Sequence, residues 1–333
     1  MRTFTRRHFL QSAGATCTLA GLPAWAADAF PAKPLTLVVP YPAGGASDAS
    51  ARIFAESFTQ SLNQQVIVEN YGGGTGLIGA NKVLSAPADG YTFLHGSPNE
   101  VILPPMLNPA ARYKPWDFVF AAPITTASIV LLVRNGIPVG TMDEFLDYAR
   151  QQKDKPLTYA SVGIDSLYHL MGDALAMRLN LPFLHVPYKG AAPALQDLAG
   201  GQVDFGILPY QTSFDGMQAQ GRLKVISSFS KDMAPGLKHI APITQSKQIP
   251  DFVHEIGGGY FMRKGTPADR VAALRKAIGE AVVKPEIRSR LEAEGRKVAQ
   301  PTETQAQADA AFKEMTDRIA ALLKVLGRKN LAL

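Results

Sequence analysis

The sequence predicts an α/β fold with mostly parallel sheets, and two patterns lead to this prediction. Short apolar runs, typical of buried strands, alternate with segments whose apolar residues recur three and four positions apart, as on one face of a helix. Loops containing glycine, proline and asparagine separate these segments. Such alternation indicates strand–helix–strand units, whose crossover connections make neighbouring strands parallel. We find no internal repeat or heptad array.

The N-terminal part of the chain predicts the first strands and helices. A buried strand over residues 34–40 leads through a glycine loop into a helix over 47–62. One face of that helix is apolar and carries Ile53, Phe54, Phe58 and Leu62. The next expected elements are strands at 65–69 and 91–94, a helix ending at Ser85, and two strands at 118–122 and 129–133.

The alternation continues in the C-terminal part. Thr141 begins a helix that turns Phe145, Leu146 and Ala149 inward. Strands are expected at 157–160, 183–186, 203–208 and 223–227, with helical stretches between them. Thr266 is expected to cap a helix that has Pro267 in its first turn. Alanine and leucine spacing up to Leu323 predicts that the last third is helical.

Residues 3–26 predict export from the cytoplasm. Arg6-Arg7 lies in a twin-arginine signature, an uncharged apolar stretch runs from Ala13 to Leu22, and Ala24-Trp25-Ala26 offers a small-x-small cleavage site. A chance arginine pair and an uncleaved anchor are the alternatives, although the apolar run is shorter than the roughly 20 residues that a spanning helix needs. We expect a periplasmic protein, exported by the twin-arginine pathway and soluble after cleavage near Ala26.

Removing residues 1–26 changes the composition that bears on function. Three of the 34 basic residues and no acidic residue lie there, so 31 basic and 28 acidic residues remain. No Lys/Arg cluster is interleaved with aromatic residues, and a nucleic-acid partner is not expected. The only cysteine, Cys17, leaves with this segment, so we expect no disulfide, thiolate nucleophile or cysteine metal site. The remaining 307 residues suit two domains.

Three glycine-containing loops follow predicted strands. The first, residues 40–48, ends a strand and begins a helix, so its N–H groups suit a carboxylate or phosphate, although a tight turn with no ligand is equally open. In the second, Gly74, Gly76 and Gly79 match G-x-G-x-x-G, but no acidic residue follows at the spacing that ribose recognition needs. We therefore favour close helix–strand approach there over a nucleotide site.

The third loop, residues 159–169, could face the first loop across a cleft. Ser161, Ser166 and the N–H groups near Gly163 are its candidate ligand contacts, and His169 is expected to pack or cap rather than catalyse. Enzyme signatures are absent from the sequence: it has no G-x-S-x-G elbow, no P-loop and no H-E-x-x-H metal motif. We therefore expect no catalytic residue, no metal site and no cofactor.

The order and spacing of several motifs resemble the tripartite tricarboxylate transporter solute-binding proteins, the Bug-type receptors. These motifs are Val39–Asp48, Val68-Glu69-Asn70 with its glycine loop, Pro87–Thr92, Tyr159–Gly163, His185–Gly190, Gly200–Asp204 and Gly265-Thr266-Pro267. The resemblance implies a type II periplasmic binding protein with two α/β lobes, two hinge strands and a cleft for a small organic anion. It assigns residues 33–128 and 253–333 to lobe 1, and 129–252 to lobe 2.

The resemblance also implies which residues bind the ligand. The first loop would hold a carboxylate through its backbone N–H groups and Ser47, braced by Asp48. In the second lobe a pocket-facing loop and a closing segment would face it, whereas Asp204 more plausibly ends a turn than touches the ligand. The expected ligand-binding set is Tyr41, Ala43, Gly44, Gly45, Ala46, Ser47, Asp48, Ser161, Gly163, Asp165, Ser166, His169, Tyr188, Lys189, Gly190 and Asp204.

This chain departs from the family pattern at Asp165, Glu100 and Tyr71. Because an acid near an anion site disfavours a second carboxylate, we expect a ligand with one carboxylate and an amine, amide or aromatic ring. The expected function is a monomeric periplasmic receptor that delivers this ligand to membrane permease subunits, or to a sensor kinase instead. A twin-arginine-exported enzyme and an orphan receptor without a transporter are the alternatives.

Overall fold

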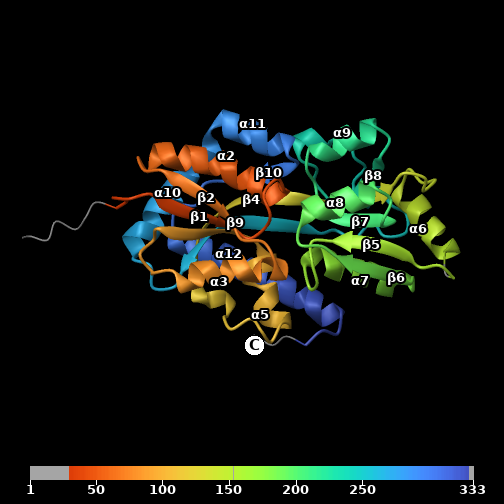
Figure 1. Cartoon of the computed structure of the whole chain (residues 1–333), viewed down its shortest axis with the longest axis horizontal. Helices are drawn as coiled ribbons and strands as arrows, with labels where there is room; N and C mark the ends of the chain where they lie inside the picture. The colour runs from red at the N-terminus through yellow and green to blue at the C-terminus, as the bar shows by residue number, and fades with distance from the viewer. Residues whose placement is uncertain (1–29, 153, 330–333) are drawn as a thin grey trace, which may run out of the picture.

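The computed structural model describes residues 30–152 and 154–329 (Figure 1). The predicted export signal and cleavage site, residues 1–26, lie outside the described residues. Ten strands form one sheet in the order β2-β1-β3-β9-β4-β7-β5-β6, and β8 and β10 also pair with β4. The strands are β1 (Leu35–Val39), β2 (Val66–Asn70), β3 (Thr92–Gly96), β4 (Phe118–Arg134), β5 (Leu157–Ser161), β6 (Phe183–Pro187), β7 (Phe205–Pro209), β8 (Leu223–Ser228), β9 (Glu255–Arg263) and β10 (Arg296–Val298).

Helices cover both faces of this sheet. They are α2 (Ala46–Ser61), α3 (Leu77–Ser85), α4 (Pro98–Val101), α5 (Leu103–Leu107), α6 (Met142–Gln151), α7 (Leu167–Leu179), α8 (Ala191–Ala199), α9 (Ser213–Ala219), α10 (Ala268–Val283), α11 (Pro285–Ala293) and α12 (Gln305–Val325). Short 3₁₀ turns are η1 (Gly74–Gly76), η2 (Pro115–Asp117), η3 (Pro235–Leu237) and η4 (Ile243–Gln245). Within the described chain, no helix combines the length and apolar character that crossing a bilayer requires.

Strand β4 joins two groups of strands. Its first part pairs antiparallel with β9 and β10, and its second part pairs antiparallel with β7 and β8. We call β1, β2, β3, β9 and β10 the first strand group and β5, β6, β7 and β8 the second strand group; Figure 1 shows them side by side, with β4 running from one to the other. The chain crosses once through β4 and returns between β8 and β9.

The two short strands expected at 118–122 and 129–133 are this single strand of 17 residues. The register against β9 shifts between Phe120 and Ala122 and again between Pro123 and Thr125. A proline donates no backbone hydrogen bond, so it suits an irregular position in a strand. The segment between the two expected strands therefore belongs to one continuous strand with bulges near Pro123.

The sheet is mixed, and the expectation of mostly parallel pairing is wrong at its centre. Pairs β1/β2, β1/β3, β5/β6 and β5/β7 are parallel, as strand–helix–strand units require. Every pair that involves β4 or β9 is antiparallel. Strand β9 was not predicted, and its centre consists of Gly257, Gly258 and Gly259, which are not typical of strands. A Cβ at Gly259 would lie 2.4 Å from the Ala122 carbonyl oxygen, so glycine is needed where β9 approaches β4.

Most predicted helix starts are confirmed, with one shift. Thr141 accepts a hydrogen bond from the Glu144 N–H in a capping box at the start of α6. The helix predicted to begin at Thr266 begins at Ala268, and its N-cap is Pro267. Thr266 Oγ1 instead donates to the Arg263 carbonyl. The proline ring fixes the chain direction there without help from a side-chain cap.

Buried apolar residues hold the helices to the sheet. Phe54 and Phe58 from α2 pack edge-on against Tyr260 of β9, with Phe93 of β3 beside them. The other face of the first strand group and the whole second strand group share a second cluster of buried residues. Each fully buried leucine or phenylalanine contributes about 1.5–3 kcal/mol of transfer free energy, so both groups are firmly anchored around β4.

Candidate functional site

A cavity lies where the two strand groups meet. The centre of a water-sized atom can occupy about 60 Å³ of it. The carboxyl ends of β1, β3, β5 and β7 converge on it, as ligand sites in α/β sheets generally do. Its lining residues are Tyr41, Pro42, Gly45, Ala46, Ser47, His95, Gly96, Ser97, Asn99, Glu100, Thr125, Ala127, Val162, Tyr168, Ala191, Ala192, Pro209, Ile256, Gly257, Gly258 and Arg296.

The N-terminus of α2 forms one wall of the cavity. The first-turn N–H groups of a helix have no acceptor within the helix. Gly45, the N-cap of α2, has no side chain that could accept from them. Ala46 and Ser47, the first two residues of the helix, line the cavity. Free N–H groups and the positive end of the helix dipole make this wall suitable for an anion.

Asp48 holds this loop in place, as expected for a bracing residue. Its carboxylate accepts from the Gly44 N–H at 3.0 Å, from Asn70 Nδ2 at 3.0 Å and from Arg52 Nε at 3.1 Å. Burial raises the pKa of Asp48, but the hydrogen bonds from Arg52, Gly44 and Asn70 outweigh it, and the net shift is downward. Asp48 is therefore ionised at neutral pH and is engaged by the loop rather than facing the cavity.

Two buried charged side chains line the cavity, and neither has a full set of partners. Arg296, 7% exposed, donates from Nη2 to the Ala46 carbonyl at 2.5 Å, while its Nε has no hydrogen-bond partner. Glu100, 1% exposed, accepts through Oε2 from the Ser97 N–H at 2.5 Å and from Ser97 Oγ at 2.7 Å. Glu100 Oε1 has no partner, and burial raises the pKa of Glu100 to about 7.

Aromatic and imidazole groups surround these charges. Burial, reinforced by the charge of Arg296, lowers the pKa of His95 to about 3, so this ring is neutral. Burial raises the pKa of Tyr41 well above its usual value, and the nearby Glu100 raises it further. Tyr41 Oη nevertheless has no hydrogen bond of good geometry. The cavity therefore presents unsatisfied polar atoms in a largely apolar enclosure, the usual composition of a small-molecule site.

The serines expected to contact a ligand from the second strand group hold their own loop instead. Ser161 Oγ and Ser166 Oγ both donate to the Gly163 carbonyl, at 3.0 and 2.8 Å. Ser166 also caps α7 by accepting from the His169 N–H. None of these residues lines the cavity; Val162 and Tyr168 from the same loop and helix do.

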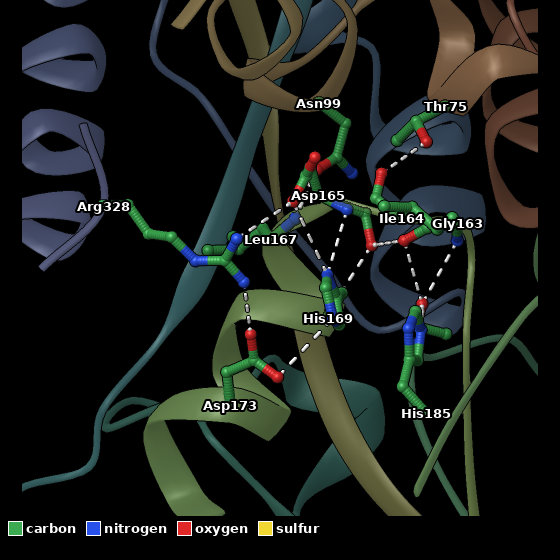
Figure 2. Close-up of polar contacts among 12 residues, drawn as sticks. Thr75, Asn99, Gly163, Ile164, Asp165, Leu167, His169, Asp173, His185 and Arg328 are labelled. Carbon is green, nitrogen blue, oxygen red and sulfur yellow. Dashed lines mark hydrogen bonds and ion pairs between the residues drawn. The ribbon is translucent and has the colours of Figure 1, made fainter. Parts of the chain in front are cut away.

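Asp165 and His169 also lie outside the cavity lining, in a polar cluster shown in Figure 2. The Asp165 N–H donates to His169 Nδ1 at 3.0 Å, and His169 Nε2 lies 3.5 Å from Asp173. Arg328, just after α12, pairs with Asp173 at 2.8 Å and lies 3.9 Å from Asp165. The inference that Asp165 selects the ligand is therefore unsupported, because its carboxylate belongs to this cluster.

The imidazole of His169 stacks on His185, with ring centroids 3.9 Å apart. Burial lowers the pKa of both rings, that of His185 to about 4, although Asp173 partly opposes this. Ser161 Oγ lies 2.7 Å from His185 Nε2. Among the residues that the structure places, no group of three histidine, cysteine or acidic side chains is arranged to hold a metal ion.

The remaining expected contacts are structural in this arrangement. Tyr188 Oη donates to Asp197 at 2.7 Å, and Tyr188, Lys189 and Gly190 do not line the cavity, whereas Ala191 and Ala192 after them do. Gly190 has φ +147°, and a Cβ there would lie 3.2 Å from the ring of Pro42.

Asp204 precedes β7, as the turn interpretation expected. Its carboxylate accepts hydrogen bonds from Arg134 Nε at 3.0 Å and from the Thr158 N–H at 2.9 Å. Its carboxylate is therefore fully engaged within the second strand group and is not available to a ligand in the cavity.

Direct contacts beside the cavity bring the two strand groups together. Thr75 Oγ1, in η1, donates to the Ile164 carbonyl at 2.8 Å, as Figure 2 shows. The Leu167 N–H, the first of α7, donates to Asn99 Oδ1 at 2.8 Å. Both bonds join segments that follow β2 and β3 to the loop and helix that follow β5, so the two strand groups are in direct contact beside the cavity.

The structure thus brings together only part of the predicted set. Tyr41, Gly45, Ala46 and Ser47 line the cavity, whereas Ala43 and Gly44 do not. Sequence reasoning noted Glu100 as unusual but missed Arg296, because the latter follows helix-like sequence and the short strand β10 gives no distinct signal.

Three comparisons with known proteins agree with this architecture. The family model described as "Tripartite tricarboxylate transporter family receptor" matches residues 50–327. A Pseudomonas sp. (strain P51) protein, described as a UPF0065 protein in the tcbD-tcbE intergenic region, is 35% identical over 295 residues, covering 88% of this chain and 87% of its own.

Two solved structures are similar over nearly their whole length. The periplasmic binding protein BugD has a TM-score of 0.81 and 30% identity, covering 90% of this chain and 99% of its own. MatC from Rhodopseudomonas palustris, solved with bound malate, has a TM-score of 0.80 and 27% identity, covering 88% of this chain and 100% of its own.

Proposed function

Because this chain belongs to the tripartite tricarboxylate transporter receptor family, we propose that it is a periplasmic receptor that captures one small organic carboxylate. The observation that carries the proposal is the uncapped first turn of α2 beside the buried guanidinium of Arg296, within one cavity. Both features supply positive charge and hydrogen-bond donors; the nearest acids, Asp48 in the first turn and Glu294 near Arg296, do not line the cavity. A carboxylate is the small group that would satisfy them.

The energetics of such a site agree with tight binding. A hydrogen bond to a charged group contributes about 1.5–3 kcal/mol. Three or four of them, after the costs of association and ordering, support roughly micromolar binding or better. The closed form is selected because only a ligand that touches both strand groups stabilises it. The lobe division proposed from the sequence, 33–128 with 253–333 against 129–252, places the hinge at β4 and the segment before β9.

The relatives support the same class of ligand. MatC, which is similar over 88% of this chain, was solved with malate, a small organic acid. The family is one of receptors, so we propose capture and release without chemical change. We further propose export by the twin-arginine route and docking of the closed form on permease subunits in the membrane. None of the contacts described here favours the alternatives of an exported enzyme or a receptor without a transporter.

A thermal-shift screen of the purified protein tests the proposal. Small mono- and dicarboxylic acids should raise the melting temperature in a concentration-dependent way, because a ligand that binds only the folded state stabilises it. Amines and neutral sugars of similar size serve as controls and should leave the melting temperature unchanged. If no acid raises it, or if a bound acid is converted during incubation, the proposed receptor function is wrong.

A further inference from the structure

The charged side chains inside the cavity indicate which group the ligand carries in addition to one carboxylate. The Nε of Arg296 and Oε1 of Glu100 are both buried and both without a partner, and both residues line the cavity. Among the described residues neither of the two forms a salt bridge, although the charge of Glu294 lies near enough to act on Arg296. A buried polar atom without a partner costs about 1–3 kcal/mol, more when charged. A ligand that meets both atoms would recover that cost.

The two charges sit at different walls of the cavity. Arg296 lies against the first turn of α2 through its bond to the Ala46 carbonyl. Glu100 lies in α4, where its Oε2 is held by Ser97 and its backbone carbonyl accepts from Tyr113 Oη. Oε1 makes no hydrogen bond of good geometry, although the Tyr41 hydroxyl lies beside the Glu100 carboxylate and is, among the described residues, its one neighbouring side-chain donor besides Ser97. The cavity therefore has a donor-rich wall and an acceptor wall.

Resting on the proposed receptor function, we propose that Arg296 and Glu100 set the ligand class. The first turn of α2 and Arg296 receive one carboxylate, and Glu100 Oε1 accepts a hydrogen bond from an ammonium or hydroxyl group elsewhere on the ligand. A second carboxylate is disfavoured because it would face the Glu100 carboxylate without a proton between them. This assigns to Glu100 the discrimination that sequence reasoning gave partly to Asp165.

The titratable groups around Glu100 make the proposal testable by pH. Tyr41, Tyr113 and Tyr168 face it, and burial raises the pKa of all three, so they stay neutral near pH 7. His95 has a pKa of about 3, and Arg296 is charged because a guanidinium keeps its proton in proteins. Among the described cavity-lining groups, Glu100 alone has a pKa, about 7, in the physiological range. Proton-coupled binding near neutral pH therefore reports on Glu100.

The test uses four acids with the same four-carbon chain: γ-aminobutyrate, γ-hydroxybutyrate, butyrate and succinate. They differ only in the group opposite the carboxylate, which is an ammonium, a hydroxyl, a methyl or a second carboxylate. Calorimetry at about pH 8, above the pKa of Glu100 of about 7, should find the first two binding at least about tenfold tighter than the last two. Succinate should bind more tightly as the pH falls from about 8 to about 6, because Glu100 becomes protonated over this range and no longer repels the second carboxylate.

Glu100→Gln removes the charge while keeping the shape and the acceptor for Ser97. This variant should bind γ-aminobutyrate about tenfold more weakly and succinate about tenfold more tightly, and its succinate affinity should not depend on pH. Glu303→Gln is the matched control, since Glu303 is exposed and does not line the cavity. This variant should rank the four acids by affinity in the same order as the wild type.

Succinate binding tightest at about pH 8, or an unchanged ranking in Glu100→Gln, would overturn the inference while leaving the receptor function intact. The wild-type pH profile decides this even if the variant does not fold. Failure of every carboxylate in the wider thermal-shift screen would instead overturn the proposed function, and this inference with it.

Discussion

Replacing Arg296 by methionine should abolish tight carboxylate binding and yet leave the protein at least as stable as before. Burial lowers the pKa of Arg296, and attraction to Tyr168, Glu294 and Tyr260 only partly opposes this. A lowered pKa in a base means that folding disfavours the charged form. Because Arg296 is charged at every pH below its folded pKa, this cost persists across the neutral range.

The magnitudes follow from the contacts. The variant loses one hydrogen bond to the Ala46 carbonyl, worth about 1 kcal/mol, and removes a buried guanidinium whose Nε has no partner. Relief of several kcal/mol of desolvation exceeds that loss, so we expect a net stabilisation of about 1–3 kcal/mol. Loss of a charge-assisted hydrogen bond of about 1.5–3 kcal/mol weakens binding about 10- to 150-fold.

The assay combines calorimetric titration of the best acid with urea unfolding of the ligand-free protein. Arg275→Met is a matched control, because Arg275 is also buried in a described helix but donates to Ala121 and Gln305 away from the cavity. It should lose stability and keep its affinity. The reasoning is refuted if Arg296→Met unfolds as easily as Arg275→Met and binds the acid as the wild type does.

Three further predictions concern the rest of the site. Tyr168→Phe should weaken carboxylate binding about 5- to 10-fold in calorimetry while the melting temperature stays unchanged, because its hydroxyl faces both Glu100 and Arg296; equal affinity would contradict this. Gly163→Ala should hinder closure, since φ is +144° and a Cβ would lie 2.6 Å from Thr75 Oγ1; small-angle scattering with ligand should then show a larger radius of gyration than for the wild type, and equal radii would count against it. Asp204→Asn should lower the free energy of unfolding by about 1–3 kcal/mol at neutral pH without changing ligand affinity. The pKa of Asp204 is lowered, because bonds from Thr158 and Arg134 outweigh the opposing effect of burial. Its contribution is therefore present above the unfolded pKa and lost as the pH falls through the folded pKa, so unfolding curves of wild type and variant should converge in acid, and parallel curves would contradict the assignment.

Much of the fold follows from local sequence. The buried strand 34–40, the helix with Phe54 and Phe58 on one face, and the capped start of α6 were all predictable, because period and capping are properties of neighbouring residues. The centre of the sheet was not. β9 contains three consecutive glycines, whose role appears only when β4 lies against it, and β10 is three residues long.

The site, like the fold, was only partly predictable from local sequence. The first loop was predictable, because a glycine turn between a strand and a helix leaves N–H groups free wherever it occurs. The loop around Gly163 was predicted to face the ligand, but its serines turn back to their own backbone. Whether Asp165 or Glu100 faces the cavity depends on side-chain direction. The Asp165 carboxylate lies 3.9 Å from Arg328, which comes from beyond α12, while its backbone N–H donates to His169 of α7. No sequence pattern reports such a tertiary preference.

A crystal structure of the protein with its best-binding acid tests the central claim most directly. The account predicts one carboxylate within about 2.7–3.2 Å of the first-turn N–H groups of α2 and of Arg296, with β4 and the second strand group closed over it. An acid bound anywhere else on the chain, or lying in the cavity with its carboxylate turned away from α2 and Arg296, would contradict it.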